Sequence, residues 1–322
     1  MISLAPMRRM SRRRRAARGD APPPAPFVVG VGRSGTTLLR LMLDAHPRMA
    51  VPPETHFIPD VIRACDRGAS RERVAEILAA SRRWADLGIP IEEIRGRFDS
   101  LDRFDATTAS RTIYLTYAEQ HGKPRWGDKT PKYSLSMREI EDALPEARFV
   151  HLIRDARGVA LSRVKMVEGR GEKPPSPAGV AGRWAKRIRQ ARVEGETLGG
   201  YLEVRYEDLV ADTEKTLREV CDFAELEFDP VMLAYHEHAS ERLEEIARDL
   251  PDAEGKRKGV VAGEHRLKVH AMAKEPPSLE RISSWRTKMS ADDQRACEEA
   301  AGDLLAELGY PVGDEVAAEV SA

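Results

Sequence analysis

Cysteine is scarce in this sequence, and the spacing of the few present argues against sites built from cysteine. The 322 residues contain three cysteines, Cys65, Cys221 and Cys297, which are far apart and include no Cys-x-x-Cys pair. An odd number at such distances favours neither a disulfide framework nor a zinc site. We expect reduced thiols and a cytoplasmic protein.

Long apolar runs and a large excess of charge of either sign are also missing. No run approaches the roughly 20 residues of a membrane-spanning helix, so we expect no membrane span. The net charge is −1, which gives no general reason to expect nucleic acid or an anionic membrane as a partner. The length suits one large domain with helical additions.

The first 25 residues are basic and rich in proline, with arginine at positions 8, 9 and 12–15 and proline at 22–24. Twin arginines suggest an export signal, but the apolar core of a signal peptide is absent. A disordered leader or a misassigned start explains the segment better. We therefore predict a disordered leader over 1–25, one folded domain over 26–312 and a flexible tail over 313–322.

The strongest motif is a glycine-rich turn between an apolar run and a helical run. Gly30, Gly32 and Gly35 allow the backbone to approach a phosphate closely. The helix that follows directs its free N–H groups and its positive dipole end at the same point. The glycine spacing fits an ATP- or GTP-binding loop, but Thr36 stands where such a loop has lysine, and Arg33 supplies positive charge instead. The motif predicts a phosphate-like ligand and disfavours a magnesium-bound triphosphate.

Strands and helices alternate along the chain, which is typical of an α/β fold with a mostly parallel sheet. Residues 252–277 are polar and lysine-rich without a clear period, so we expect a long loop of the kind that often serves as a lid or binding segment. We expect strands over 27–31, 148–153 and 201–205 and helices over 36–45, 156–167, 180–198, 213–223 and 291–308. Residues 58–80 and 91–121 are expected to be mostly helical.

Several segments follow one another in an order typical of one enzyme family. The loop at 32–37 is followed by Lys129 in Gly-Asp-Lys-Thr-Pro, by Arg154 with Ser162, by residues 205–209 and by the segment of Trp285. Together they resemble the sulfotransferases that use 3′-phosphoadenosine 5′-phosphosulfate (PAPS), especially the tyrosylprotein sulfotransferases and their bacterial relatives. The resemblance runs from about residue 27 to 311. It implies a P-loop-NTPase-like sulfotransferase fold with helical insertions.

The resemblance also implies which residues bind the donor. The loop would hold the 5′-phosphosulfate, and Arg154 with Ser162 would clamp the 3′-phosphate, a role for which a guanidinium fork is well suited. Arg157 lies between these two and is a further candidate for the 3′-phosphate, whereas Ser284 stands where the family carries a basic residue before Trp285. The donor-binding set implied is Arg33, Ser34, Gly35, Thr36, Thr37, Arg154, Ser162 and Tyr206.

A general base must remove the proton of the acceptor hydroxyl or amine as it attacks sulfur. Glu54 occupies the position of the catalytic glutamate in the tyrosylprotein enzymes, and the prolines before it stiffen the backbone. A free glutamate is a weak base, so we expect burial to raise its pKa. His56 is the alternative base, since its pKa suits neutral pH. A plain helix-capping role for Glu54 is the third interpretation.

The resemblance assigns Lys129 and Arg33 to the negative charge that develops on the transferring group and on the leaving phosphate. We expect no metal, and a small-molecule, lipid or saccharide acceptor. The sequence leaves open whether the chain forms a homodimer. Two rivals remain, which are a kinase-like phosphotransferase with a degenerate loop and a nucleotide-binding relative that has lost transfer.

Overall fold

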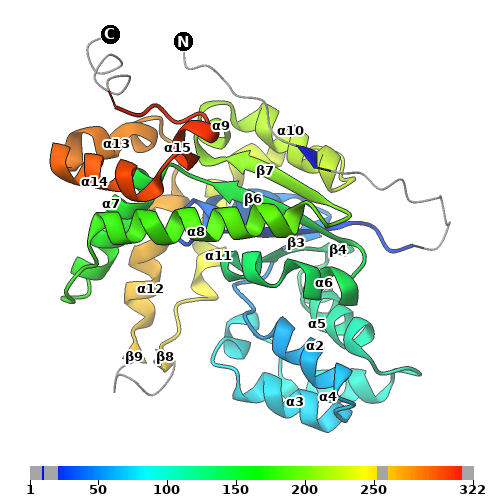
Figure 1. The fold of residues 1–322 in the computed structure, drawn as a ribbon. Coiled ribbons are helices and arrows are strands. Elements are labelled where there is room, and N and C mark those ends of the chain that lie inside the picture. Colours follow the sequence, from blue (N-terminus) through cyan, green and yellow to red (C-terminus); the bar gives the residue numbers. More distant parts are fainter. Residues whose placement is uncertain (1–8, 11–20, 252–259, 314–322) are drawn as a thin grey trace.

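A mostly parallel sheet lies at the centre of the structure, with helices on both faces (Figure 1). The structure is a computed structural model in which residues 9–10, 21–251 and 260–313 are described. Among these residues, no helix is long and apolar enough to cross a membrane. The predicted tail, apart from Gly313, and most of the predicted leader lie outside the described residues.

The strand order explains where functional side chains gather. The central sheet has the order β1-β7-β6-β2-β5, in which all neighbours are parallel except β1 with β7. Parallel strands bring their carboxyl ends to one edge, where ligands of such sheets bind. The strands are β1 (Arg9–Met10), β2 (Ala25–Gly30), β3 (Met49–Ala50), β4 (Arg125–Trp126), β5 (Asp128–Lys129), β6 (Ala147–Ile153), β7 (Tyr201–Arg205), β8 (Leu250–Pro251) and β9 (Val260–Val261).

Side chains alternate between the two faces of the sheet, so each face has its own core. Phe27 and Val29 pack with α2, α4 and α5, whereas Val28 packs with α1, α9 and α10. The helices are α1 (Thr36–Ala45), α2 (Ile58–Asp66), α3 (Arg71–Ala80), α4 (Ile91–Asp99), α5 (Ala106–Gln120), α6 (Met137–Ala143), α7 (Ala156–Glu168), α8 (Pro177–Gly195), α9 (Tyr206–Ala211), α10 (Thr213–Phe223), α11 (Ala239–Glu244), α12 (Gly263–His270), α13 (Glu280–Lys288), α14 (Ala291–Ala301) and α15 (Leu304–Glu307), with 3-10 turns η1 (Trp84–Leu87), η2 (Pro131–Leu135), η3 (Pro230–Glu237) and η4 (Ala271–Lys274).

The α/β class and the parallel sheet are confirmed, and two expectations about elements are wrong. Of the long loop expected over 252–277, residues 252–259 lie outside the described part, but 263–274 are helical, as α12 and η4. The single helix expected over 291–308 is two helices, because Gly302 has φ 60° and ψ −150° and interrupts the chain between α14 and α15. Glycine adopts this conformation without steric cost.

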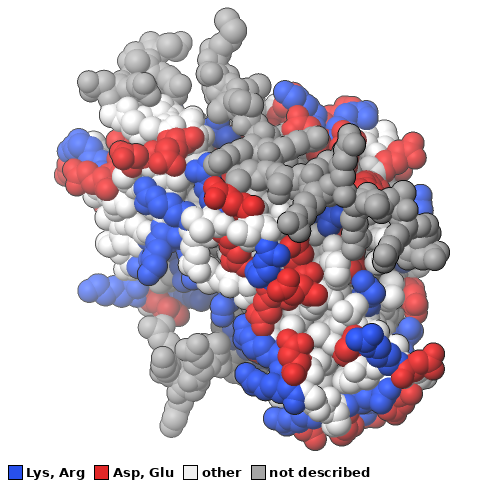
Figure 2. Space-filling view, turned by 45° about the vertical axis from the view of Figure 1, so that its right-hand side comes forward, with Lys and Arg blue, Asp and Glu red and all other residues white. Residues whose placement is uncertain are grey.

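Basic and acidic side chains are interspersed on the surface shown in Figure 2, in keeping with the net charge of −1. Attraction for an anionic ligand must therefore come from a local site, and the carboxyl edge of the sheet supplies one. Arg33 follows β2, Lys129 ends β5, Arg154 follows β6 and Tyr206 follows β7.

Candidate active site

The glycine-rich loop is built as a tight turn between β2 and α1. Gly35 is the N-cap of α1 with φ 92°, and Arg33 also has a positive φ, of 82°. A Cβ at Gly35 would lie 2.4 Å from the ring of Tyr206, so the aromatic ring rests directly on the loop. The Ser34 N–H donates to the Val31 carbonyl (3.1 Å) and is thus used within the turn. The first-turn N–H groups of α1, from Thr36 onward, have no partner within the helix and are of the kind that binds anions at a helix N-terminus.

The Arg33 side chain points to Ser162, the residue that the family resemblance assigns to the 3′-phosphate together with Arg154. Its Nε donates to the Ser162 Oγ (3.0 Å), and its Nη2 donates to the Val269 carbonyl (3.4 Å). Burial and the neighbouring charges of Arg154 and Arg163 lower the pKa of Arg33 to about 10. The guanidinium therefore stays charged at neutral pH. A bound anion would reduce its repulsion by the neighbouring arginines.

Arg154 lies against the same loop. Its Nη1 donates to the Arg33 carbonyl (3.3 Å) and its Nη2 to the Arg281 carbonyl (2.9 Å). Its guanidinium stacks over the ring of Tyr206, 4.4 Å from the centroid. Its Nε is buried and has no hydrogen-bond partner among the described residues, which is a costly state for a charged donor. The structure thus brings together Arg33, Arg154, Ser162 and Tyr206 from four segments.

Arg157 does not share this site, contrary to one expectation from the sequence. It is fully buried, donates to both carboxylate oxygens of Asp155 and pairs with Glu298 (2.6 Å). Its guanidinium lies 3.7 Å from the ring centroid of Trp285, which is itself buried. Asp155 also caps α7 by accepting from the Arg157 N–H. These groups hold α13, α14 and the segment at Pro311 to α7.

Glu54 forms an ion pair with Lys129 at the end of β5. The Lys129 Nζ donates to the Glu54 Oε1 (2.9 Å), and the His56 Nε2 lies 2.7 Å from the Glu54 Oε2. Burial raises the pKa of Glu54, but the charge of Lys129 and the hydrogen bond from His56 outweigh it and hold this pKa well below its usual range. The expected upward shift is therefore wrong for this arrangement. Burial lowers the pKa of Lys129.

A buried network fixes the backbone on both sides of this pair. The Thr55 N–H donates to the Thr130 Oγ1 (3.0 Å), and the Thr55 hydroxyl donates to the Asp128 Oδ2 (2.8 Å). Tyr114 donates to the same oxygen (2.9 Å), and the Tyr133 hydroxyl lies 2.7 Å from the Thr55 hydroxyl. Because Thr55 adjoins Glu54 and both Asp128 and Thr130 adjoin Lys129, the network sets the distance between the two charged side chains.

His56 has a strained backbone, with φ 53°. Non-glycine residues in this region are uncommon and cluster at functional sites. The left-handed turn places the imidazole against the carboxylate two residues earlier, where it orients Glu54.

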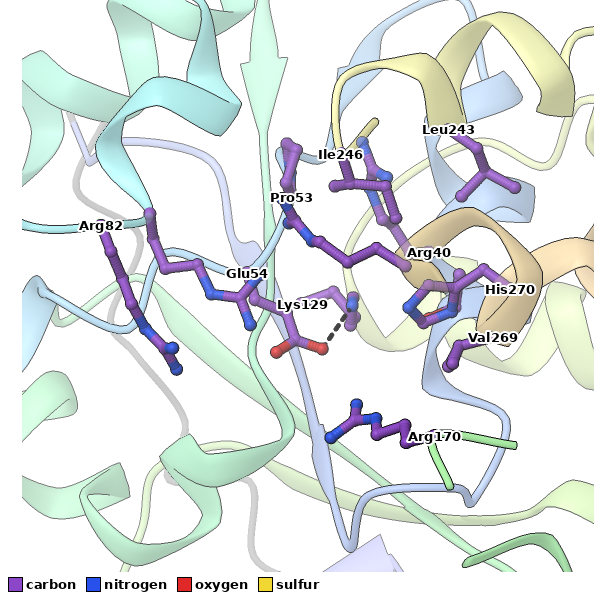
Figure 3. A pocket seen from close by; sticks show the side chains of 13 residues that line it. Arg40, Pro53, Glu54, Arg82, Lys129, Arg170, Leu243, Ile246, Val269 and His270 are labelled. Carbon is purple, nitrogen blue, oxygen red and sulfur yellow. Dashed lines mark hydrogen bonds and ion pairs between the residues drawn. The ribbon is translucent and has the colours of Figure 1, made fainter. Parts of the chain in front are cut away.

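A cavity of about 240 Å³ opens beside Glu54 and Lys129 (Figure 3). Thr37 of the loop helix lines it together with side chains that sequence reasoning missed. Val269 and His270 end α12, in the segment expected to be a loop. Burial and the charges of Lys129 and Arg33 lower the pKa of His270 to about 3, so its imidazole is neutral. The lining residues not singled out from the sequence include Arg82, Arg83, Arg170, Arg266, Val269 and His270.

The sequence carries only weak signals for these additional residues. Arg82 and Arg83 stand side by side just before η1, and Arg170 follows α7, but arginine is common throughout this chain. The lid-like character expected of the 252–277 segment is the one signal that pointed toward the cavity.

Comparison with known proteins gives the family. A sequence model described as the sulfotransferase family matches residues 24–230. A putative protein-tyrosine sulfotransferase of Caenorhabditis briggsae is 27% identical over 288 residues, which cover 88% of this chain and 88% of the relative. Protein-tyrosine sulfotransferase 1 of Danio rerio is 28% identical over 294 residues, covering 89% of this chain and 72% of the relative.

Solved structures give the fold. The sulfotransferase domain of the olefin synthase of Synechococcus PCC 7002 superimposes with a TM-score of 0.55 at 22% identity, over 93% of this chain and 100% of that domain. The sulfotransferase domain of the curacin biosynthetic pathway gives a TM-score of 0.54 at 20% identity, over 90% of this chain and 99% of that domain. The sheet, the glycine-rich loop and the matched segment lead to one conclusion: the chain belongs to the sulfotransferase family and is a sulfotransferase enzyme.

Proposed function

We propose that this enzyme transfers the sulfuryl group of PAPS to a hydroxyl or amine of a small-molecule, lipid or saccharide acceptor. The observation that carries the proposal is the position of the Glu54–Lys129 pair on the same sheet edge as Arg33, Arg154 and Ser162. A base and a cation thus lie beside a cradle suited to phosphate groups.

The donor-binding roles follow from charge and from unsatisfied donors. Arg33 and the first-turn N–H groups of α1 bind the 5′-phosphosulfate, as a helix N-terminus binds anions. Arg154 and Ser162 bind the 3′-phosphate. The buried Nε of Arg154 lacks a partner among the described residues, which is consistent with an oxyanion ligand there. Tyr206 packs against the loop and Arg154, near where the adenine is expected.

The transfer forms a bond between the acceptor oxygen or nitrogen and sulfur and breaks the bond between sulfur and the 5′-phosphate oxygen. Glu54 takes the acceptor proton, and adenosine 3′,5′-diphosphate leaves with the electron pair of the broken bond. Lys129 and Arg33 stabilise the charge that develops on the sulfuryl oxygens and the leaving phosphate. Positioned bases and preplaced cations are each common sources of rate enhancement in group transfer.

The low pKa of Glu54 gives Lys129 a second role. While Lys129 pairs with Glu54, the carboxylate is a poor base. When the Lys129 ammonium turns toward the sulfuryl group, the carboxylate loses its main counter-charge, and burial then raises its pKa. The carboxylate becomes basic at the stage at which a proton must be taken.

Incubation with PAPS that carries a radiolabelled sulfuryl group tests the function. We expect label to pass to members of a mixed panel of hydroxylated metabolites, lipids and saccharides without added metal. Transfer of label from the γ-phosphate of magnesium ATP, with none from PAPS, would instead support the kinase-like alternative. Binding of adenosine 3′,5′-diphosphate without transfer to any acceptor would support the non-catalytic one.

A further inference from the structure

The cavity beside Glu54 has walls of two kinds. Figure 3 shows Arg82 and Arg170 near Glu54, whereas Leu243, Ile246 and Val269 lie on another side of the cavity. Leu243 belongs to α11 and Val269 to α12, so the apolar wall comes from the C-terminal half of the chain. Arg40 and His270 share the side of the apolar residues. A ligand that fills this space therefore meets arginines beside Glu54 and a largely apolar wall on the other side.

The cationic wall carries more positive charge than its own carboxylates balance. Arg266 forms a bidentate pair with Asp86 (2.5 and 3.0 Å), and Arg83 shares one oxygen of the same carboxylate at 3.3 Å. The Asp86 side chain is fully buried, so a single negative charge stands between two guanidinium groups. Within hydrogen-bonding distance, Arg83 and Arg266 thus share one carboxylate, and only Arg266 is paired with both of its oxygens.

Arg83 is the group that retains binding capacity. Its Nε is buried and has no hydrogen-bond partner among the described residues, although its side chain lines the cavity. A buried unsatisfied guanidinium N–H is costly, so a turn of the Arg83 side chain that directs this donor at an anion in the cavity would be favourable.

Three other cations of the wall are less suited to this task. Arg40 is balanced by Glu245 at 2.7 Å and also donates to the Val51 carbonyl. Lys129 is engaged by Glu54. Arg170 is exposed, and its Nε donates to His265, so solvent screens its charge.

The size of the cavity limits what can enter. Its volume of about 240 Å³ lies below the usual range of small-molecule pockets, which begins at about 300 Å³. Side chains of α11, α12 and the residues before η1 bound this space, so its volume limits the group that can fill it. The cavity therefore suits a compact molecule.

We propose that the acceptor is a small hydroxylated molecule with an apolar body and an anionic group, and that Arg83 binds this anion while Glu54 faces the hydroxyl. This assignment rests on the proposed sulfuryl transfer, because it identifies the cavity as the acceptor site. Leu243, Ile246 and Val269 pack against the apolar body.

Calorimetry with a matched pair of probes tests the assignment. Octanoate and octanamide share an apolar chain and differ in charge, and both are titrated into the full chain with and without saturating adenosine 3′,5′-diphosphate. We expect octanoate to bind more tightly than octanamide. Arg83→Gln should weaken octanoate about tenfold or more, the usual effect of losing a charge-assisted hydrogen bond. It should leave octanamide unchanged.

The controls separate this proposal from the proposed function. Arg83→Gln leaves the Arg266–Asp86 pair in place, and Arg73→Gln removes an exposed arginine of the neighbouring helix α3 as the matched control. Adenosine 3′,5′-diphosphate should bind the wild type and both variants equally. Failure of the wild type to bind this nucleotide speaks against the proposed function, whatever the octanoate result.

Three outcomes would overturn the acceptor assignment. In the first, octanoate binds the wild type no better than octanamide, or Arg83→Gln does not weaken it. In the second, Arg83→Gln weakens adenosine 3′,5′-diphosphate as much as octanoate, which would place Arg83 in the donor site. In the third, an acidic tyrosine-containing peptide binds more tightly than octanoate, which would point to a protein acceptor.

Discussion

Glu54 shows how two neighbouring side chains can hold one carboxylate in its charged form. Lys129 and His56 contact its two oxygens at 2.9 and 2.7 Å and keep the carboxylate ionised. The glutamate and the lysine could be chosen from the sequence because they stand in recognisable segments. The sign of the pKa shift could not, because it depends on an ion pair between residues 75 positions apart.

Glu54→Gln tests the proposed role of Glu54 as the base directly. We expect turnover to fall roughly 10²- to 10⁴-fold, the usual contribution of a general base, because the amide cannot take a proton. The affinity for adenosine 3′,5′-diphosphate should stay close to that of the wild type. Steady-state transfer from PAPS and calorimetry measure the two quantities, and a wild-type rate would remove Glu54 from the mechanism.

Lys129→Met tests the electrostatic control of that base. In the wild type the pKa of Glu54 lies well below its usual range, so loss of activity by its protonation should begin only in strong acid. Without Lys129, burial raises the pKa of Glu54, and the acid limb of kcat/KM should move upward in pH. Turnover at the optimum should also fall. Exposed Lys132→Met is the control, and a pH profile of unchanged shape in Lys129→Met would contradict the coupling.

At the scale of elements, local signals predicted the loop, α1, β6 and β7 well. Glycine spacing, β-branched runs and the Ser290 cap are local properties of the sequence, and the structure has the elements that they predict. The segment at 263–274 was missed because its apolar residues lack a helical period, and its helix is held by tertiary contacts such as Arg266 with Asp86. The break at Gly302 was missed because a lone glycine in a helical pattern is often tolerated.

Gly35→Ala tests the fit between the loop and α9. The φ of 92° disfavours alanine, and its Cβ would meet the Tyr206 ring at 2.4 Å. We expect the free energy of unfolding to fall by roughly 2–4 kcal/mol. Gly32→Ala is the matched control, because nothing lies within 4 Å of its added Cβ. Denaturant unfolding measures both, and equal stability of the two variants would show that the loop accommodates a side chain at position 35.

Asp128→Asn tests the buried network at β5. Burial raises the pKa of Asp128 from 3.8 to about 6. Because the pKa of Asp128 is higher in the folded than in the unfolded protein, the protonated group contributes to the free energy of unfolding. This contribution is fully present below pH 3.8 and is lost as pH rises through about 6. The loss is about 3 kcal/mol at most. The variant keeps an oxygen that accepts from Thr55 and Tyr114 but should lose this pH dependence. Exposed Asp142→Asn should behave as the wild type, and an unchanged slope of unfolding free energy against pH in Asp128→Asn would contradict the shift.

At the scale of the whole molecule, segments that are far apart in the sequence contact one another at the site. Val269 accepts from Arg33 across 236 residues, and Arg281 accepts from Arg154 across 127. Contacts between residues so far apart in sequence leave no periodicity or motif. The sequence therefore could not predict that Arg83 and the other wall residues line one cavity. The net charge of −1 likewise conceals a cavity with a local excess of arginine.

The most direct test of the central claim is a calorimetric comparison of adenosine 3′,5′-diphosphate, 5′-AMP and ATP, without metal. Arg33, Arg154 and Ser162 should favour the nucleotide that carries both phosphates, because each charge-assisted bond contributes about 1.5–3 kcal/mol. We predict tight binding of adenosine 3′,5′-diphosphate and at least about tenfold weaker binding of the other two. Preference for ATP, strengthened by magnesium, would contradict the assignment of this site to PAPS.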